Sequence, residues 1–578
     1  MLKALKKILQ NQKIDFFLLP NSDEFFSEYL PESEKRISYL TGFAGSNASI
    51  IIGQEKSYFF TDGRYILQSK SEIDLVEFTI FNIAEKSALS WLEENLSNGK
   101  KLALDAKLTS LNFANACKKI AQKNSAEIIF LEENPLDKIW QNRAEKNNSK
   151  VFFLDEKLVG KSSKSKRDEV LENFSADATI ITKPENLCWL LNIRAADIEF
   201  TPLLLAYGIL FKDGKVDLFV DEERLKGLNL PEVNLIPPQD FTARISELKK
   251  SAHKIQIDPN TTNYWLHEVL QKNNFEIILK ADVIEILKSC KNETEIKGAI
   301  EAHKLDGAAV TKFLFWLKNN KEIDEISAAE KLLEFRKQSA DFLYPSFASI
   351  SGFASNGAVI HYHATEKTNK KFTGNALYLI DSGGQYFGKI CGTTDITRTI
   401  AIGNPTTEMI EDFTRVLKGH IALARAKFPI GTSGAQLDAL ARFHLWQAKK
   451  DFDHGTGHGV GSFLSVHEGP CGISKRNHQA LLPGMILSNE PGFYADGEYG
   501  IRIENLMLLE KLDEKFLHFK TLTLAPLDAS LIDFKMLTYP EKKWLKEYHE
   551  KIAKEVGDLL GKDEKDWLQN LVRTYQGQ

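Results

Sequence analysis

The chain has little of several features that mark other classes of protein. Its five cysteines are scattered and form no CxxC pair, so we expect reduced thiols and no disulfide framework. The formal net charge is only −5, from 74 basic and 79 acidic residues, which gives no electrostatic footprint for nucleic acid or an anionic membrane surface. The longest uncharged apolar run, Pro202 to Phe211, is far shorter than the roughly 20 residues of a membrane-spanning helix. The sequence therefore predicts no nucleic-acid partner and no membrane partner.

We also expect no secretory leader at the N-terminus. The first twenty residues contain lysines but no uninterrupted apolar stretch and no small-residue cleavage site, so we expect a cytoplasmic location. An organellar presequence is the alternative, because the first acidic residue is Asp15, but the arginine and serine enrichment of such peptides is absent.

The length and composition predict several globular domains. A chain of 578 residues with 43% apolar and 26% charged residues folds throughout but is too long for one hydrophobic core. A polar stretch at residues 141–150 suits a linker, and the run Asn292 to Glu295 has the pattern of a helix start. We expect domains at residues 1–149, 150–290 and 291–578, the last with an amphipathic helical extension from about residue 530.

The first two of these domains share a faint internal similarity. Tyr39 to Phe43 (YLTGF) resembles Trp189 to Ile193 (WLLNI), and each precedes a pair of β-like runs. In the second domain the runs 203–211 and 216–220 are joined by a turn containing Asp-Gly, a strong hairpin signal. Two related α/β domains are the interpretation that these patterns favour, although any two α/β segments can share them.

Acidic residues at strand ends dominate the C-terminal half. Asp381 ends an apolar β-like run before a tight turn, and Asp395 lies in the next β-like run. A lone Asp at such a position is usually a turn former, but two acids on adjacent hairpin strands can face one point. Glu490 and Glu504 each close a further apolar strand, and the period of two places Arg502 on the face of Glu504. Arg502 can thus orient the carboxylates.

A glycine-rich run supplies two histidines, His454 and His458. Four glycines between residues 454 and 461 make a helix unfavourable, at about 1 kcal/mol each. We therefore expect an extended strand with His454, Thr456 and His458 on one face. The run does not fit GxGxxG, so it predicts no dinucleotide site.

The four carboxylates would repel one another and raise their pKa values unless cations balance them. Two divalent ions balance four acids. Oxygen-rich coordination with a single imidazole suits Mn²⁺ and, less exclusively, Fe²⁺, Co²⁺ or Zn²⁺, so the metal's identity stays open. The sequence predicts a two-metal site with the ligands Asp381, Asp395, His458, Glu490 and Glu504.

Together these residues resemble the pita-bread metallopeptidases of peptidase family M24B, and specifically the three-domain Xaa-Pro aminopeptidases, also called aminopeptidase P. The resemblance covers nearly the whole chain, through residues 39–49, 61–65, 186–200 and 360–504. It implies an α/β fold with two related creatinase-like N-terminal domains followed by a pita-bread catalytic domain. It also implies two metal ions, usually manganese, bridged by Asp395 and Glu504, and a homodimer.

The resemblance assigns roles to three further residues, His361, His454 and His467. His361 and His467 would bind the substrate carbonyl or the tetrahedral intermediate as catalytic and substrate-binding groups. His454 would line the proline pocket, and Arg502 would also contribute to substrate binding. Structural packing is the alternative for each histidine, and it is the interpretation we favour for His420, His444 and His549.

The expected reaction removes the N-terminal residue from peptides with proline in the second position. A metal-bridging hydroxide would attack the scissile carbonyl, and Glu490 would accept and relay a proton. A prolidase acting on dipeptides, a methionine aminopeptidase, a creatinase-like hydrolase without metal, and a non-catalytic pita-bread scaffold are the alternatives. All five expected ligands are present, which disfavours the last two.

One departure from the family concerns the hairpin between Asp381 and Asp395, which looks longer than usual. We expect its additional residues, 386–391, to form a solvent-exposed turn. The alternative is that they fold toward the cleft and alter substrate access.

Overall fold

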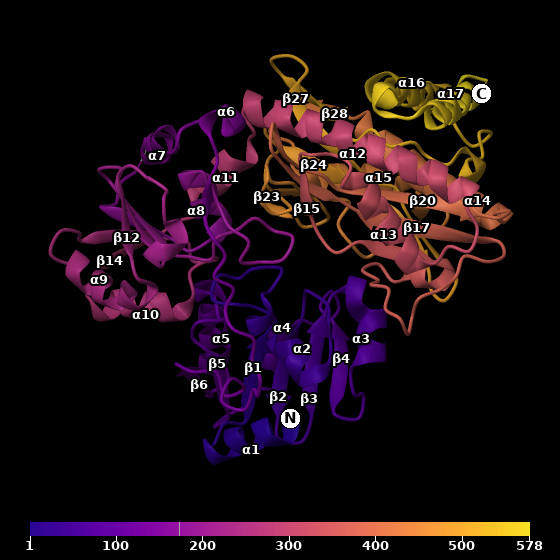
Figure 1. The fold of residues 1–578 in the computed structure, drawn as a ribbon. Helices are drawn as coiled ribbons and strands as arrows, with labels where there is room; N and C mark the ends of the chain where they lie inside the picture. Colours follow the sequence, from indigo (N-terminus) through magenta and orange to yellow (C-terminus); the bar gives the residue numbers. More distant parts are fainter. Residues whose placement is uncertain (173, 578) are drawn as a thin grey trace. The chain divides into compact units, whose positions relative to one another are not determined.

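The computed structural model describes residues 1–172 and 174–577. It has the mixed α/β architecture expected (Figure 1). The chain forms two compact units, one of residues 1–154 with 161–284 and the other of residues 155–160 with 285–578.

The first unit contains two six-stranded sheets. The strands of the first sheet lie in the order β4-β3-β2-β1-β5-β6, where β1 is antiparallel to β2 and parallel to β5. Their bounds are β1 Phe16–Pro20, β2 Ser49–Gly53, β3 Ser57–Thr61, β4 Phe78–Asn82, β5 Lys101–Asp105 and β6 Glu127–Leu131. Its helices are α1 Leu2–Asn11, α2 Arg36–Thr41, α3 Ile66–Glu72, α4 Ala88–Asn95 and α5 Leu111–Lys123.

The second sheet repeats this topology in the order β12-β11-β10-β8-β13-β14. Its central strand β8 is antiparallel to β10 and parallel to β13, as β1 is to β2 and β5. The bounds are β8 Ala178–Ile181, β10 Gly208–Phe211, β11 Val216–Phe219, β12 Val233–Ile236, β13 Lys254–Ile257 and β14 Glu276–Leu279. The matching strand order confirms that the two halves of this unit are related.

The two similar pentapeptides also end helices in the same way. Gly42 caps α2 with φ +84°, and Asn192 caps α8 (Pro184–Leu191) with φ +54°. Both positions require a left-handed backbone, which Gly and Asn adopt most readily. The similarity in the sequence therefore reflects a shared helix end.

The hairpin expected around Asp213-Gly214 is present, with Gly214 at φ +86°. However, β10 begins at Gly208, so the prediction of a strand from Leu203 is wrong. The amides of Leu204 and Leu205 are bonded instead by side chains, the sulfur of Cys188 and a carboxylate oxygen of Asp197. These apolar residues are buried as irregular chain because side chains satisfy their backbone donors.

The second unit packs helices on short antiparallel sheets (Figure 1). The helix α12 (Glu293–Asn319) begins at the expected residue, with a capping box between Asn292 and Glu295. The other helices are α11 Val283–Ser289, α13 Glu325–Arg336, α14 Thr407–Ala424, α15 Gly434–Trp446, α16 Tyr539–Val556 and α17 Lys562–Gln576. The strands are β15 Phe342–Pro345, β16 Ile350–Phe353, β17 Ala376–Ser382, β18 Gly384–Phe387, β19 Cys391–Thr393, β20 Ile396–Ile402, β21 Lys427–Pro429, β22 Gly457–Gly459, β23 Glu468–Ile473, β24 Ile486–Asn489, β25 Gly492–Ala495, β26 Tyr499–Arg502, β27 Asn505–Lys511 and β28 Phe516–Thr521.

The C-terminal extension is helical, as expected. In α16, Leu545, Tyr548, Ile552 and Val556 are buried in the core of their own unit. Leu559, which we expected on the same helix face, lies beyond α16 in a short 3-10 turn and is exposed. Among the described residues, no helix combines the length and apolar character needed to span a membrane.

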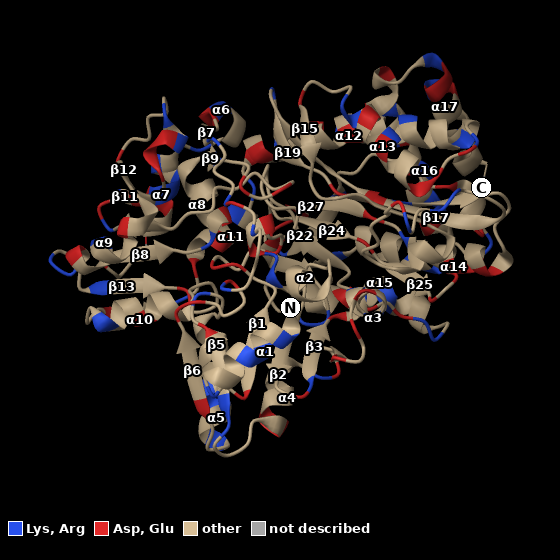
Figure 2. Ribbon diagram, turned by 60° about the horizontal axis from the view of Figure 1, so that its bottom comes forward, with Lys and Arg blue, Asp and Glu red and all other residues tan. Residues whose placement is uncertain are grey.

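Both signs of charge are distributed over the chain. In the view of Figure 2, basic and acidic segments are interspersed along the same helices and loops, such as α17. This distribution fits the nearly balanced charge of the sequence.

Candidate metal centre

Two adjacent antiparallel strands bring Asp381 and Asp395 together. In β17 Asp381 lies opposite Thr397 of β20, and Asp395 immediately precedes β20. Both aspartates are buried. The hairpin thus supplies two carboxylates to one point, as the spacing predicted.

A second group of strands supplies the other three predicted ligands. His458 lies in β22, which pairs with β24 through Gly459 and Leu487. Glu490 directly follows β24, and Glu504 directly precedes β27. Because β24 pairs with β27, the two glutamates are held at the same end of this sheet.

The structure gathers all five predicted ligands into overlapping groups whose donor atoms lie within 4.8 Å of one another. The groups are Asp381, Asp395 and Glu504; His458, Glu490 and Glu504; and Asp395, His458 and His467. Asp395, His458 and Glu504 each belong to two groups. Two of these three, Asp395 and Glu504, are the residues that the resemblance assigns as bridging ligands.

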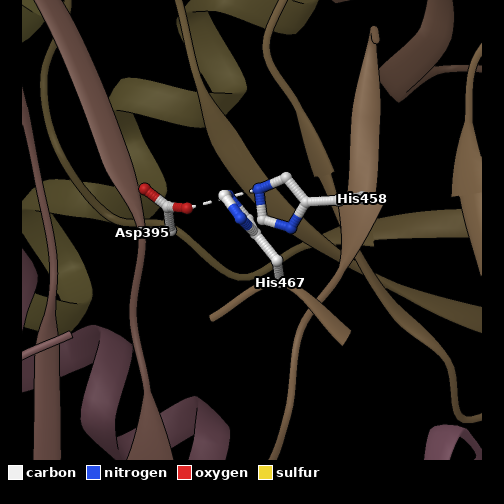
Figure 3. Close-up of side chains that lie close together, drawn as sticks. All are labelled: Asp395, His458 and His467. Carbon is white, nitrogen blue, oxygen red and sulfur yellow. Dashed lines mark ion pairs between the residues drawn. The ribbon is translucent and has the colours of Figure 1, made fainter. Parts of the chain in front are cut away.

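One of the donor groups also contains His467, which the resemblance assigns to substrate binding. Its ring is 4.2 Å from that of His458, edge to face, and both rings lie beside the Asp395 carboxylate (Figure 3). It directly precedes β23, whose Glu468 pairs with Gly459 of β22. Its position therefore suits either a contact to substrate at the metal edge or a place in the donor set.

The electrostatics of His458 are dominated by its acidic neighbours. Its Nε2 lies 3.4 Å from Asp395 Oδ2 and 3.5 Å from Glu490 Oε1. Burial alone would lower the pKa of His458, but the hydrogen bond to Asp395 and the charge of Glu490 raise this pKa to about 9. Without a metal, a proton on His458 therefore takes the place of a cation.

The buried carboxylates show the complementary effect. Desolvation, opposed by Arg502 and reinforced by Asp395, raises the pKa of Asp381 to about 7. Desolvation and the charges of Asp395 and Asp381 raise the pKa of Glu504 well above its ordinary value. Among the described residues, the Oδ1 atoms of Asp381 and Asp395 are buried with no hydrogen-bond partner. Partnerless oxygens and crowded carboxylates are what a pair of divalent cations would satisfy, so these residues fit the metal pair.

Arg502 contacts the carboxylates as expected. Its Nη2 donates to Asp381 Oδ2 at 2.7 Å, and its Nε donates to Thr397 Oγ1 at 3.1 Å. Thr397 Oγ1 in turn donates to Glu504 Oε2 at 2.7 Å. The guanidinium therefore fixes one carboxylate directly and a second through Thr397, a residue that the sequence analysis missed.

His454 belongs to the same network through Tyr494. Its Nε2 shares a 2.8 Å hydrogen bond with the Tyr494 hydroxyl, which also accepts from Arg502 Nη1 at 2.7 Å. The expected extended strand through His454 is wrong, because β22 contains only residues 457–459. Thr456 is buried, with its hydroxyl bonded to Asp438 of α15, whereas His454 and His458 both lie near the Glu490 carboxylate, at 3.8 and 3.5 Å.

His361 lies outside the donor groups found among the described residues. It is half-buried in the loop after residues 354–358 and precedes the buried Tyr362. The Tyr362 hydroxyl is bonded to Glu325 Oε2 at 2.9 Å. The role of His361 stays a prediction.

Two histidines that we assigned to packing are fully buried. His420 Nδ1 donates to the carbonyl of Asn489, and His420 Nε2 accepts from the side-chain amide of Asn505. These two asparagines are adjacent to Glu490 and Glu504 in the chain. Burial lowers the pKa of His420 to about 3, and burial does the same for His549. Both therefore stay neutral, whereas His444 is half-buried at the end of α15.

Asp306 of α12 contacts the hairpin that carries Asp381 and Asp395. The sequence did not predict this role. The fully buried carboxylate pairs with Arg336 Nε at 2.6 Å and accepts from Thr394 Oγ1 at 2.8 Å and Tyr386 OH at 2.9 Å. Arg336 also donates to the carbonyl of Ser382. One acid thus holds both residues adjacent to the ligands Asp381 and Asp395.

The long hairpin between these ligands is mostly buried. Tyr386 and Cys391 are fully buried, and only Gly388 and Lys389 at its tip are exposed. The prediction of a solvent-exposed turn holds for this tip alone. The hydroxyl of Tyr386 needs its buried acceptor Asp306, which lies too far away in the chain for a local pattern to show it.

Family models match four consecutive segments of the chain. Residues 1–133 and 142–295 match two models of the creatinase/prolidase N-terminal domain. Residues 297–511 match metallopeptidase family M24, and residues 515–575 match the C-terminal region of peptidase M24.

Curated proteins are similar over the full length of the chain. Xaa-Pro aminopeptidase 1 of Dictyostelium discoideum is 36% identical, covering 99% of this chain and 96% of that protein. A probable Xaa-Pro aminopeptidase P of Laccaria bicolor is also 36% identical, covering 98% of this chain and 92% of that protein.

Two similar solved structures differ in how much of this chain they cover. The X-prolyl aminopeptidase from Caenorhabditis elegans, described as a cytosolic enzyme with a di-nuclear active site, has a TM-score of 0.94 and 32% identity, covering 99% of this chain and 98% of that one. The prolidase from Pyrococcus horikoshii has a TM-score of 0.52 and 26% identity and covers 63% of this chain and 99% of its own.

Proposed function

This chain belongs to metallopeptidase family M24, and on that premise we propose that it is an Xaa-Pro aminopeptidase with a di-nuclear metal site. It hydrolyses the N-terminal residue from peptides that have proline in the second position. The observation that carries this proposal is the similarity to Xaa-Pro aminopeptidases over 99% of the chain, combined with a gathered set of five metal-binding side chains.

The proposed metal ligands are Asp381, Asp395, His458, Glu490 and Glu504. Their support is the overlap of the donor groups at Asp395, His458 and Glu504 and the partnerless Oδ1 atoms of the two aspartates. Mn²⁺ is the ion that we propose, because carboxylate oxygens outnumber the imidazole nitrogen. When bound, two such ions polarise the scissile carbonyl and lower the pKa of a water molecule.

The protein's own residues then position the substrate and move the proton. Glu490 accepts a proton through its carboxylate, which Ser488 Oγ orients by donating to Oε1 at 3.1 Å. His467, at the edge of the donor set, donates to the substrate carbonyl oxygen as charge develops there, and His361 has the same role. His454 and Tyr494 border the pocket for proline, and Arg502 holds them in register with Asp381.

Prolidase activity is the alternative within the family. The prolidase from Pyrococcus horikoshii matches only 63% of this chain, whereas the full-length relatives are named Xaa-Pro aminopeptidases. We therefore assign activity on tripeptides and longer peptides. The division into residues 1–149, 150–290 and 291–578 is proposed on the same basis, since the family models change near these boundaries.

The first test measures release of the N-terminal residue from Arg-Pro-Pro-type peptides before chelation, after chelation and after Mn²⁺ is restored. We expect activity that is lost with chelator and returns with Mn²⁺. An Xaa-Pro dipeptide measured in parallel separates the two specificities, because a prolidase would cleave only the dipeptide. Inactivity with Mn²⁺, Zn²⁺, Co²⁺ and Fe²⁺ would favour a scaffold role instead.

We also propose a homodimer in the cytoplasm. The surface that fits a second copy is the outer face of α15, where Leu440, Phe443 and Trp446 are exposed at three-residue spacing. Trp446→Glu should give a monomer by sedimentation analysis, whereas Leu512→Glu, at an exposed apolar residue on another element, should leave the dimer intact. A Trp446→Glu protein that still sediments as a dimer would exclude this face.

A further inference from the structure

The β18–β19 hairpin packs against the loop that leads from His458 to His467. The ring of Phe387 stacks on Phe463, with centroids 5.1 Å apart and planes 10° apart. Gln385 Nε2 donates to the carbonyl of Leu464 at 2.8 Å, and Thr393 Oγ1 fixes the Gln385 amide by donating to its Oε1 at 2.8 Å. One aromatic contact and one hydrogen bond therefore join the hairpin to the middle of this loop.

The loop at residues 461–465 is held in an unusual backbone conformation. Phe463 has φ +50°, in the left-handed region that bulky residues rarely adopt, yet its side chain is fully buried. The amide of Gly461 donates to the carbonyl of Ser465 at 3.0 Å and closes the base of the loop. Strain of this kind persists only where surrounding contacts enforce it. The contacts of the loop with Phe387 and Gln385 can enforce the left-handed conformation of Phe463.

The hairpin is itself rigidly anchored. Tyr386 donates to Asp306, which is paired with Arg336, and all three side chains are buried. Gly392 of β19 approaches α12 closely, since a Cβ at this position would lie 2.6 Å from Cβ of Ala302. A fixed support thus lies on one side of the loop, and His467 follows the loop by two residues.

We propose that the β18–β19 hairpin is a positioning element for His467, with Phe387 and Gln385 as the positioning residues that act through Phe463 and Leu464. This inference rests on the proposed function of His467. The hairpin fixes the loop backbone, and the loop sets the distance between the His467 ring and the neighbouring His458 and Asp395. Among the described residues, the donor groups contain no member of β18 or β19.

The test compares Phe387→Ala with His467→Ala and with the double variant. We expect Phe387→Ala to lower kcat by about tenfold, the range of supporting residues around a metal site, with unchanged metal content and a smaller effect on KM. If Phe387 acts through His467, the double variant has the same kcat as His467→Ala alone. Phe387→Tyr, which keeps the stacked ring, should restore kcat. Lys389→Ala at the exposed tip of the same hairpin is the matched control and should match the wild type.

A second measurement separates this inference from the proposed role of His467. Hydrogen exchange of amides 461–466 should be faster in Phe387→Ala than in the wild type, whether or not His467 contributes to turnover. Unchanged exchange would overturn the inference, and so would a double variant whose losses multiply. A His467→Ala variant with full activity and fast loop exchange in Phe387→Ala would reject the role of His467 and with it the catalytic part of the inference.

Discussion

At Tyr494 a single hydroxyl joins His454, which we propose for the proline pocket, to Arg502, which contacts the proposed metal ligand Asp381. The hydroxyl accepts from Arg502 and shares a hydrogen bond with His454, and burial raises the pKa of Tyr494 to about 12. Tyr494→Phe should lower kcat by about tenfold to a hundredfold, because supporting groups of a metal site have effects of that size. Steady-state kinetics and metal analysis check this result. Wild-type kcat in the variant would mean that Arg502 is positioned by Asp381 and Thr397 alone.

Asp306 gives a second prediction at the scale of single residues. Asp306→Asn leaves Arg336 buried without its countercharge and should destabilise the protein by about 3–5 kcal/mol, with reduced metal affinity because the neighbours of Asp381 and Asp395 shift. Urea unfolding and metal titration provide the measurements. Glu334→Gln, which breaks the exposed pair with Lys331, is the control and should cost less than about 1 kcal/mol. Equal costs for the two variants would contradict the prediction.

The sequence predicted some residues of the candidate site and not others. The five proposed ligands, which the structure brings together, could be predicted because each acid or histidine lies in a local pattern of strand and turn residues. Thr397, Tyr494 and Asp306 could not, because their function depends on contacts across the chain. Thr394, for example, reaches Asp306 over 88 residues. Such partners come together only when strands and helices pack, so no short sequence motif predicts them.

Between elements, a buried charge cluster connects α11 and the segment after it to β23. Lys288 Nζ lies 2.8 Å from Glu468 Oε2, Lys291 Nζ lies 2.5 Å from Glu468 Oε1, and all three side chains are buried. Glu468 directly follows His467. The cluster therefore holds the start of β23, which follows the loop that the β18–β19 hairpin contacts.

Removing Glu468 should be more damaging than removing either lysine. In Glu468→Gln two buried ammonium groups lose their shared countercharge, and we expect a loss of at least about 3–5 kcal/mol. Lys288→Met keeps the pair of Lys291 with Glu468 and should cost less. The free energies of unfolding of both variants, measured with denaturant, show which loss of stability is larger. The reverse order would show that the lysines are balanced by an acid other than Glu468.

Elements differed in how far the sequence predicted them. The helix that begins at Asn292 was predicted because its capping box is local, whereas the run from Leu203 was not a continuous strand because Cys188 and Asp197 bond its amides. In the run from Leu203, side-chain acceptors thus replaced the expected backbone ladder. The strand at His458 is shorter than predicted although the carbonyl of Thr456 accepts from the amide of Glu490.

For the whole molecule, the crowded acids link metal binding, pH and stability. The metal-free folded state holds extra protons, because the pKa of Asp381 is raised to about 7, that of Glu504 is raised well above its ordinary value and that of His458 is raised to about 9. A folded state that binds more protons than the unfolded state loses stability as pH rises. Metal ions must displace these protons, so their affinity rises over the same range.

We therefore expect the increase in Tm on adding Mn²⁺ to be larger at about pH 8 than at about pH 6. Thermal unfolding of metal-free and Mn²⁺-loaded protein at both pH values measures it. Asp381→Asn is the control, because it removes one of the titrating ligands and should flatten the dependence. A wild-type increase that is independent of pH would mean that these side chains release no protons to the metal.

The grouping of residues 155–160 with the catalytic unit has a consequence for dissecting the protein. The chain passes between the two units at three places, near residues 154, 160 and 284. Within the catalytic unit, α6 (Glu156–Val159) receives a hydrogen bond from Asn292 Nδ2 to the carbonyl of Val159. A gene truncated to begin at residue 285 would thus delete part of the unit it was meant to isolate. A single proteolytic cut near residue 284 would leave residues 155–160 on the N-terminal fragment but packed in the catalytic unit. Nicked protein should therefore run as two pieces in a denaturing gel and, through this noncovalent packing, as one in a native gel.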